Sequence, residues 1–187
     1  MNFLKKVFIL NFIIIALSLC FLVFNANAEE VKIFTVDSEK IAESSVAFKE
    51  ARKKIDEKRE QYEAKSAKMQ ETLTKKFQDL EKRKNVISTE AYNKEREQNI
   101  VEAEKYQRTA YMERANLEQA YQALVNDFYE KLTEVITKKA KDKNASLVLN
   151  KMHVLYSEDK LDITDLIIEQ LNKDLKIIKV KFNNNVQ

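Results

Sequence analysis

Hydrophobic positions along residues 29–84 change from a short strand-like run to a long helical repeat. Residues 31–36 (VKIFTV) are rich in β-branched and aromatic side chains and predict a first body strand within residues 29–37. From about residue 41 to residue 84 no helix breaker interrupts the chain. Apolar residues there recur every seven positions and then more closely, at Phe48, Ile55, Tyr62, Met69, Leu73, Phe77 and Leu80. Because a self-sufficient coiled coil needs two apolar positions per heptad, this helix is predicted to require a neighbour.

The pattern that follows supplies this neighbour. Residues 85–90 interrupt the repeat, and Ser88 or Thr89 can accept hydrogen bonds from the free N–H groups that open a second helix. This helix is expected to extend to about residue 143, with apolar positions at helical spacing: Ala103, Tyr106, Ala110, Leu117, Tyr121, Leu124, Phe128, Leu132 and Val135. At about 1.5 Å per residue, the two helices would be roughly 60 and 80 Å long, longer than a compact domain of this size is wide. Residues 38–143 therefore predict a protruding antiparallel helical hairpin arm.

Residues 144–187 predict a return to the body. Residues 145–149 and 153–156 favour two strands joined by a turn at residues 150–152, where Asn150 tolerates turn geometry. Asp162 can cap a last helix over residues 163–175, and weak alternation over residues 176–181 is compatible with a final strand. The predicted fold is mainly α, with the arm inserted between strands of a small β body. Such a body is too small to close a large core alone, so we expect oligomerisation.

Residues 1–28 have the layout of a secretory signal peptide. Lys5 and Lys6 precede an apolar stretch over residues 7–24, and Ala26 and Ala28 form a small-x-small cleavage site. We therefore expect export and cleavage, with the mature chain starting at Glu29. The apolar stretch approaches the ~20 residues that span a bilayer, so an uncleaved membrane anchor is the alternative.

Composition narrows the possible functions. The chain has no glycine and no proline, so it cannot form the glycine-rich loops that cradle phosphates. The one cysteine lies in the predicted signal segment and His153 is the one histidine, so ligands for zinc or haem and residues for Cys–His catalysis are lacking. Carboxylates on the predicted helices are interleaved with Lys and Arg, which is typical of a solvated surface. We expect no enzyme, no cofactor and no metal site.

Charge is unevenly distributed along the arm. Removal of residues 1–28 takes away Lys5 and Lys6 and no acid, so the net charge falls from +3 to +1. Residues 49–84 carry a net charge of +5 and residues 85–130 one of −4, which favours their pairing. Export and the small net charge argue against a nucleic-acid partner. Anionic lipid or lipopolysaccharide is a better partner for the basic residues near the arm tip, with a merely soluble surface as the alternative: Lys75, Lys76, Lys82, Arg83 and Lys84.

The order of signal peptide, strand, hairpin, strands and last helix resembles that of the Skp/OmpH family of periplasmic chaperones. The specific residues are 32–37 (KIFTVD), 147–150 (LVLN), 154–156 (VLY) and 162–164 (DIT), while the arms match in pattern only. The resemblance implies a homotrimer whose strands join in a central β-barrel. Three arms would then enclose a cavity that holds unfolded outer-membrane proteins in the periplasm, without ATP. The chain departs from the family in its small net charge and in a tail, residues 176–187, beyond the usual last helix.

The arm and the body then supply candidate interaction residues. Contacts with an unfolded protein cargo, here called the client, are expected from adaptable apolar and phenolic side chains of the arm: Tyr62, Met69, Leu73, Phe77, Tyr92, Tyr106 and Tyr111. For each of them, packing within the hairpin is the alternative role. Trimer contacts are expected in the body, at Ile33, Phe34, Val36, Leu147, Val148, Val154 and Tyr156.

The resemblance implies an ATP-independent holdase, which binds unfolded outer-membrane proteins and prevents their aggregation in transit. The competing hypothesis is an envelope structural or tethering coiled-coil protein without chaperone activity, in which the helices act as a spacer.

Overall fold

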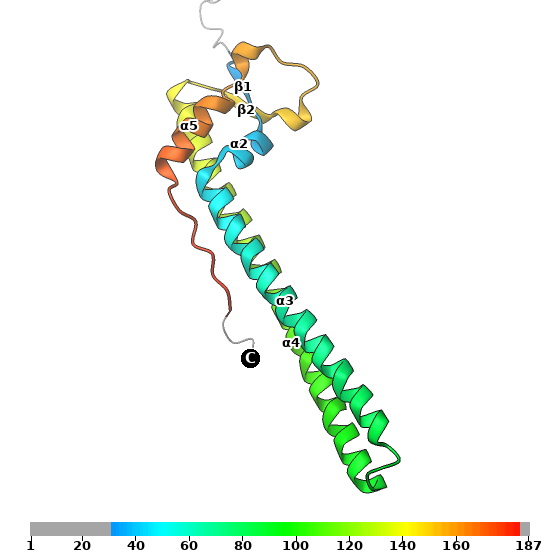
Figure 1. Cartoon of the computed structure of the whole chain (residues 1–187). Coiled ribbons are helices and arrows are strands. Elements are labelled where there is room, and N and C mark those ends of the chain that lie inside the picture. The colour runs from blue at the N-terminus through cyan, green and yellow to red at the C-terminus, as the bar shows by residue number, and fades with distance from the viewer. Residues whose placement is uncertain (1–30, 184–187) are drawn as a thin grey trace, which may run out of the picture.

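The computed structural model describes residues 31–183, which form a long helical hairpin with a small body at one end (Figure 1). The elements in chain order are β1 (Ile33–Val36), α2 (Ser38–Ser44), α3 (Val46–Arg83), α4 (Thr89–Asp142), β2 (Leu147–Asn150), η1 (Lys151–His153), η2 (Asp159–Leu161) and α5 (Thr164–Asp174). The mainly helical fold with a small sheet agrees with the sequence prediction. The predicted signal segment, residues 1–28, lies outside the described residues, as do residues 184–187.

The two long helices α3 and α4, with the turn between them, form the arm. Each begins with a serine whose hydroxyl accepts a hydrogen bond from a backbone N–H of the first turn: Ser45 from Phe48 (3.3 Å) and Ser88 from Ala91 (3.2 Å). Since neither helix contains glycine or proline, both run without a backbone break over 38 and 54 residues.

Helix α4 ends on an asparagine in the left-handed conformation. Asn144 has φ 53°, and its N–H donates to the carbonyl of Lys141 (3.0 Å) while the N–H of Ala145 donates to that of Ala140 (2.8 Å). These two bonds form a Schellman motif, in which glycine is the usual residue. The sequence analysis expected an asparagine in a glycine-like turn conformation at Asn150, but Asn150 is extended (φ −75°, ψ 130°) and Asn144 takes the left-handed conformation instead.

The predicted first helix is interrupted at Ser45, which is extended (φ −74°, ψ 117°) and separates α2 from α3. The break exposes a backbone carbonyl and an N–H group, and the side chain of Asn172 in α5 satisfies both. It donates to the carbonyl of Ser44 (3.2 Å) and accepts from the N–H of Val46 (3.0 Å). Because the compensating residue lies in a distant part of the chain, local sequence patterns did not reveal the break.

The main apolar core lies at the base of the arm, where α3 and α4 meet α2 and α5. The largest fully buried side chains include Phe128, Ile41, Ile55, Leu124, Ile167 and Leu171. The rings of Phe48 and Phe128 contact each other at a tilt of 48°, with centroids 4.6 Å apart. Full burial of a side chain such as Phe128 contributes about 1.5–3 kcal/mol, so this cluster is the main source of stability for the base.

The sheet consists of two short parallel strands, with Ile33 of β1 opposite Leu147 of β2 and Val36 opposite Asn150. The predicted strand over residues 153–156 is not formed. The carboxamide oxygen of Asn150 accepts a hydrogen bond from the N–H of Met152 (3.1 Å), and this contact turns the chain into η1 instead. Residues 176–181 form no strand either.

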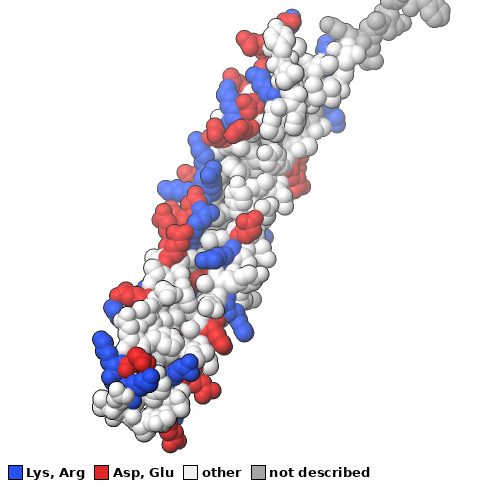
Figure 2. Space-filling model, turned by 90° about the vertical axis from the view of Figure 1, so that its right-hand side faces the viewer, with Lys and Arg blue, Asp and Glu red and all other residues white. Residues whose placement is uncertain are grey.

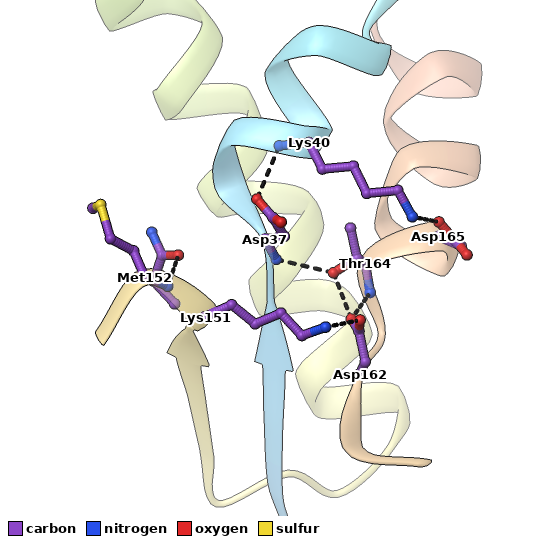
Figure 3. A network of polar contacts seen from close by, with 8 residues as sticks. Asp37, Lys40, Lys151, Met152, Asp162, Thr164 and Asp165 are labelled. Carbon is purple, nitrogen blue, oxygen red and sulfur yellow. Dashed lines mark hydrogen bonds and ion pairs between the residues drawn. The ribbon is translucent and has the colours of Figure 1, made fainter. Parts of the chain in front are cut away.

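A polar network joins the ends of these elements (Figure 3). The carboxylate of Asp162 accepts hydrogen bonds from the N–H of Thr164 (2.8 Å) and from the Lys151 ammonium (2.5 Å). The hydroxyl of Thr164 accepts one from the N–H of Asp37 (2.9 Å). Burial by itself would raise the pKa of Asp162, but the hydrogen bonds from Lys151 and Thr164 outweigh it and lower that pKa.

We expect Asp162→Asn to destabilise the protein by about 1–3 kcal/mol at pH 7, because a charged acceptor of several hydrogen bonds is lost. The folded-state pKa of Asp162 lies below its unfolded value of about 3.9, so the wild type should lose this contribution as the pH falls through the folded-state pKa. Urea unfolding followed by circular dichroism at several pH values measures both effects.

Asp159→Asn, which removes an exposed carboxylate of the neighbouring η2 that acts on Lys151 only through its charge, is the matched control and should change stability much less. Equal stability of the Asp162→Asn variant and the wild type at pH 7, or a stability difference that does not shrink in acid, would contradict the assignment.

Candidate functional site

The middle of the arm is held together differently from its base. Within the described chain, α3 buries Ala47, Ala51 and Ile55 near the base and Leu73 and Leu80 near the tip, but no residue over 56–72. This stretch is about 25 Å long at the rise of an α-helix. The buried side chains that α4 contributes opposite it are polar, Glu113 and Asn116. We call this stretch, residues 56–72 together with Tyr106, Glu113 and Asn116, the waist.

Hydrogen bonds across the waist replace apolar packing. The carboxylate of Glu113, whose side chain is 6% exposed, accepts from the Lys65 ammonium (2.7 Å). The carboxamide of Asn116 donates to the hydroxyl of Tyr62 (3.3 Å), and the hydroxyls of Tyr106 and Ser66 share a hydrogen bond (2.5 Å). Only the carboxylate of this ion pair is buried, since the Lys65 side chain is 57% exposed, and the desolvation cost of Glu113 offsets much of the attraction. The waist is therefore satisfied in its polar groups but weakly held.

Two grooves flank the waist. The larger has a volume of about 770 Å³, runs between α3 and α4 from Arg52 to Gln70, and is lined on α4 by Leu117 and Tyr121. The smaller, of about 280 Å³, is lined by residues that include Met69 and Lys105. Ser66, Tyr106 and Glu113 line both grooves and so form the partition between them. Aromatic rings mixed with paired charges are suited to weak contacts with a polypeptide and not to binding one small molecule tightly.

The predicted client residues divide into three groups by exposure. Leu73 is buried between the helices, and Tyr62, Met69, Tyr92 and Tyr106 are half-buried. The hydroxyl of Tyr92 donates to the carboxylate of Glu81 (2.9 Å), and this bond raises the pKa of Tyr92 and lowers that of Glu81. Phe77 is 38% exposed and Tyr111 is 75% exposed. Of the seven predicted residues, these two present the most surface to a client.

The predicted basic residues near the tip are largely paired with acids. Lys75 contacts Glu71 (2.5 Å), Arg83 contacts Glu95 (2.6 Å) and Asp79 (3.0 Å), Lys84 contacts Glu81 (3.3 Å), and Lys76 contacts Glu102. Figure 2 shows acidic and basic side chains interspersed along one face of the arm down to its tip. Lys82 is the member of the group for which residues 31–183 provide no ion pair. Binding of anionic lipid at this group stays a prediction.

The ion pairs that cross the hairpin all have the same polarity. Lys65–Glu113, Lys76–Glu102 and Arg83–Glu95 each join a base on α3 to an acid on α4. The opposite net charges of the two helices predicted this arrangement. The hydrogen bond to Glu95 raises the pKa of Arg83, so that pair is attractive even at the surface.

The predicted trimer residues lie on both sides of the sheet. Val36 is buried, and Phe34, Val148 and Val154 are half-buried against the body. Ile33, Leu147 and Tyr156 are exposed. Sequence reasoning missed the residues that extend this exposed apolar surface, which are Leu149, Met152 and Leu155.

Sequence reasoning also missed the polar residues of the waist. Glu113 and Asn116 continue a buried stripe that runs through Ala120, Leu124 and Phe128 at spacings of three and four. An apolar search does not find them, because they are polar. The helical spacing itself, extended toward the N-terminus from Ala120, was the available signal.

Within residues 31–183 no helix is both long and apolar enough to cross a membrane. No group of three or more His, Cys, Asp or Glu residues there is placed to hold a metal ion.

Comparisons with known proteins point to one family. The family model for OmpH-like outer membrane proteins matches residues 32–171. A crystal structure of a candidate outer membrane chaperone (OmpH-like) from Caulobacter crescentus CB15 is similar to this chain, with a TM-score of 0.76 and 18% sequence identity. The match covers 84% of this chain and 94% of that chain, and at this identity the likeness concerns the fold. No curated protein sequence matches the chain.

We expect the waist to open before the base of the arm. Backbone amides over residues 58–72 should exchange hydrogen about ten-fold faster or more, relative to intrinsic rates, than amides over residues 47–55, since fewer apolar contacts resist local opening. Hydrogen exchange followed by mass spectrometry measures this difference. Replacement of the buried ion by an apolar side chain in Glu113→Leu should slow exchange in the waist, whereas Glu118→Leu, at an exposed position of α4, should not. Uniform protection along α3 would contradict the expectation.

Proposed function

The chain belongs to the OmpH-like family of outer membrane proteins, and on this premise we propose that it is an ATP-independent holdase chaperone of the periplasm. It binds unfolded outer-membrane proteins and keeps them from aggregating on the way to the outer membrane. It acts by binding and not by catalysis, and it uses no cofactor. The single observation that carries the proposal is an arm of two long helices with weakly held, mixed apolar and charged surfaces, in a chain of this family.

The chemistry of the clients explains why such an arm is useful. Transmembrane β-strands alternate apolar and polar residues, and unpaired strands aggregate through their edges. A carrier has to separate them without binding one sequence tightly. Exposed apolar residues of the arm, such as Phe77, Val101 and Tyr111, are spaced among charged ones and provide many weak contacts.

The body supports a homotrimer. Two parallel strands of four residues each are too few to be stable as an isolated sheet. Ile33, Leu147 and Leu149 lie on these strands and are 37–47% exposed, and Leu155 and Tyr156 project from the loop that follows. In a trimer the strands of three copies join around one axis, cover this apolar surface and direct the three arms to the same side.

A tethering protein with an uncleaved N-terminal anchor is the second candidate, favoured by the apolar stretch over residues 7–24. N-terminal sequencing of the protein from the cell envelope separates the two. A chain that starts at Glu29 has no tether, whereas one that retains residues 1–24 supports the tethering role.

We expect the mature protein to keep an unfolded transmembrane β-barrel protein soluble after dilution from urea. The double variant Phe77→Ser with Tyr111→Ser should lower this protection several-fold, because two apolar contacts to the client are lost. Light scattering measures aggregation and circular dichroism checks the fold. Val46→Ser, which removes an exposed apolar side chain at the base of α3, is the control. Unchanged client aggregation with wild-type protein would refute the holdase function.

Sedimentation equilibrium tests the trimer. The wild type should sediment with three times the mass of one mature chain. Leu147→Asp should give monomers, because a charge on a covered strand face costs several kcal/mol, whereas Val101→Asp, at an exposed apolar position of the arm, should stay trimeric. A monomeric wild type rules out the trimer, and a trimeric Leu147→Asp variant rules out this strand face as the interface.

A further inference from the structure

The tail beyond α5 lies along the arm. From Leu175 it runs as an extended chain beside α4 toward the waist, in the direction opposite to α4 (Figure 1). A shallow groove is lined by tail residues 175, 177–179 and 181 and by Asp127, Glu130 and Glu134 of α4. The described part of the tail, residues 176–183, thus covers a continuous strip of the arm from its base to Asn116.

The tail contacts this strip with every second side chain. Ile178 is buried, and Val180 and Phe182 are half-buried against the core of the base. Residues 177, 179 and 181 between them are exposed. The Lys58 ammonium lies 5.9 Å from the ring centroid of Phe182. Residues 177–182 therefore have the side-chain pattern of a β-strand with one apolar face, although no neighbouring strand pairs with them.

At the far end, a buried side chain binds the tail through its backbone. The carboxamide oxygen of Asn116 accepts a hydrogen bond from the N–H of Asn183 (2.7 Å), and its NH₂ group donates to the carbonyl of the same residue (2.9 Å). Asn116 is 4% exposed and also donates to the hydroxyl of Tyr62 (3.3 Å). In the described part of the tail, Asn116 binds only the backbone N–H and C=O groups of residue 183. A carboxamide that binds in this way can recognise an extended backbone of any sequence.

We propose that this strip, formed by Lys58, Tyr62 and Asn116 together with the adjoining face of α4, is a binding site for extended strands of clients, and that the tail is its built-in occupant. The proposal rests on the holdase function and names the segment that competes with the client. A transmembrane β-strand offers what the tail offers, which is alternate apolar side chains on an extended backbone.

Competition by the tail has a calculable effect on affinity. When a site is available for only a fraction of the time, the apparent affinity of its ligand is the intrinsic affinity multiplied by that fraction. If the tail covers the strip about nine-tenths of the time, its removal should tighten the binding of a single strand about ten-fold. A tethered occupant acts at an effective concentration of about a millimolar, so it excludes weak ligands and yields to a long unfolded chain with many contacts.

The experiment compares the mature chain with a version that ends at Lys176. The probe is a fluorescein-labelled peptide of residues 175–187, followed by anisotropy. It should bind the shortened chain about ten-fold more tightly than the full chain, and an unlabelled unfolded transmembrane β-barrel protein should displace it. A peptide of the same composition with its apolar residues grouped together should not bind.

Asn116→Ala in the shortened chain should weaken peptide binding several-fold, while Asn126→Ala, which changes an exposed asparagine on the same helix, should not. Because loss of Ile178 from the core can lower stability, binding is measured at a temperature where circular dichroism shows both chains folded. The full-length Asn116→Ala variant provides a second test: because the tail and the client lose the same backbone contact, it should bind the client no more tightly than the wild type.

The outcomes separate the two proposals. Equal peptide binding by the full and shortened chains, or bound peptide that the unfolded barrel protein does not displace, overturns the strand site even if the full chain still prevents aggregation. Peptide binding and displacement without any protection from aggregation would support the strand site and refute the holdase function.

Discussion

The fold depends on one packing interaction, the apolar contact of α3, α4 and α5 around Phe128 at the base of the arm. Ile55 and Leu124 complete the contact between the long helices, and Ile167 and Leu171 of α5 close it from the side. Helix α5 also satisfies the backbone groups released at Ser45 through Asn172. The same elements thus fix the direction in which the arm leaves the body, and the arm beyond Ile55 needs little further apolar packing to keep its course.

Because apolar packing is concentrated at the base, the two helices are held together at the waist by hydrogen bonds and ion pairs. Every polar group named there has a partner, so the waist is not strained, but solvent-exposed pairs add little free energy and are screened by salt. Packing is therefore weakest at the waist, between the base and the buried Leu73 and Leu80 near the tip. For the proposed holdase function, a firm base would keep the arm in position while a loose middle would let its surface adapt to different clients.

The features predicted correctly are those that depend on the local spacing of apolar and charged residues. The heptad repeat, the serine at residue 88 and the opposite charges gave the hairpin and its cross-helix ion pairs. The features missed depend on distant partners. Ser45 caps α3 locally, but the backbone groups exposed at the break before it are satisfied only by the distant Asn172. Residues 153–156 have strand-like composition, but Asn150 turns the chain before them. Side chains of the tail are alternately exposed and covered, as in a strand, yet the tail packs against helices. Composition reports what a segment is able to form, and its neighbours decide the outcome.

The absence of glycine and proline bears on how the arm can move. A helix bends sharply at proline, at glycine or where an inserted group breaks the hydrogen-bond ladder, and α3 and α4 contain neither of the two residues. The one left-handed residue in the described chain, Asn144, lies after the end of α4 and not within the arm. The arm therefore has no backbone hinge. Under the proposed function, adjustment to a client would require two intact helices to slide or part at the waist, which would break the Lys65–Glu113 and Tyr106–Ser66 contacts.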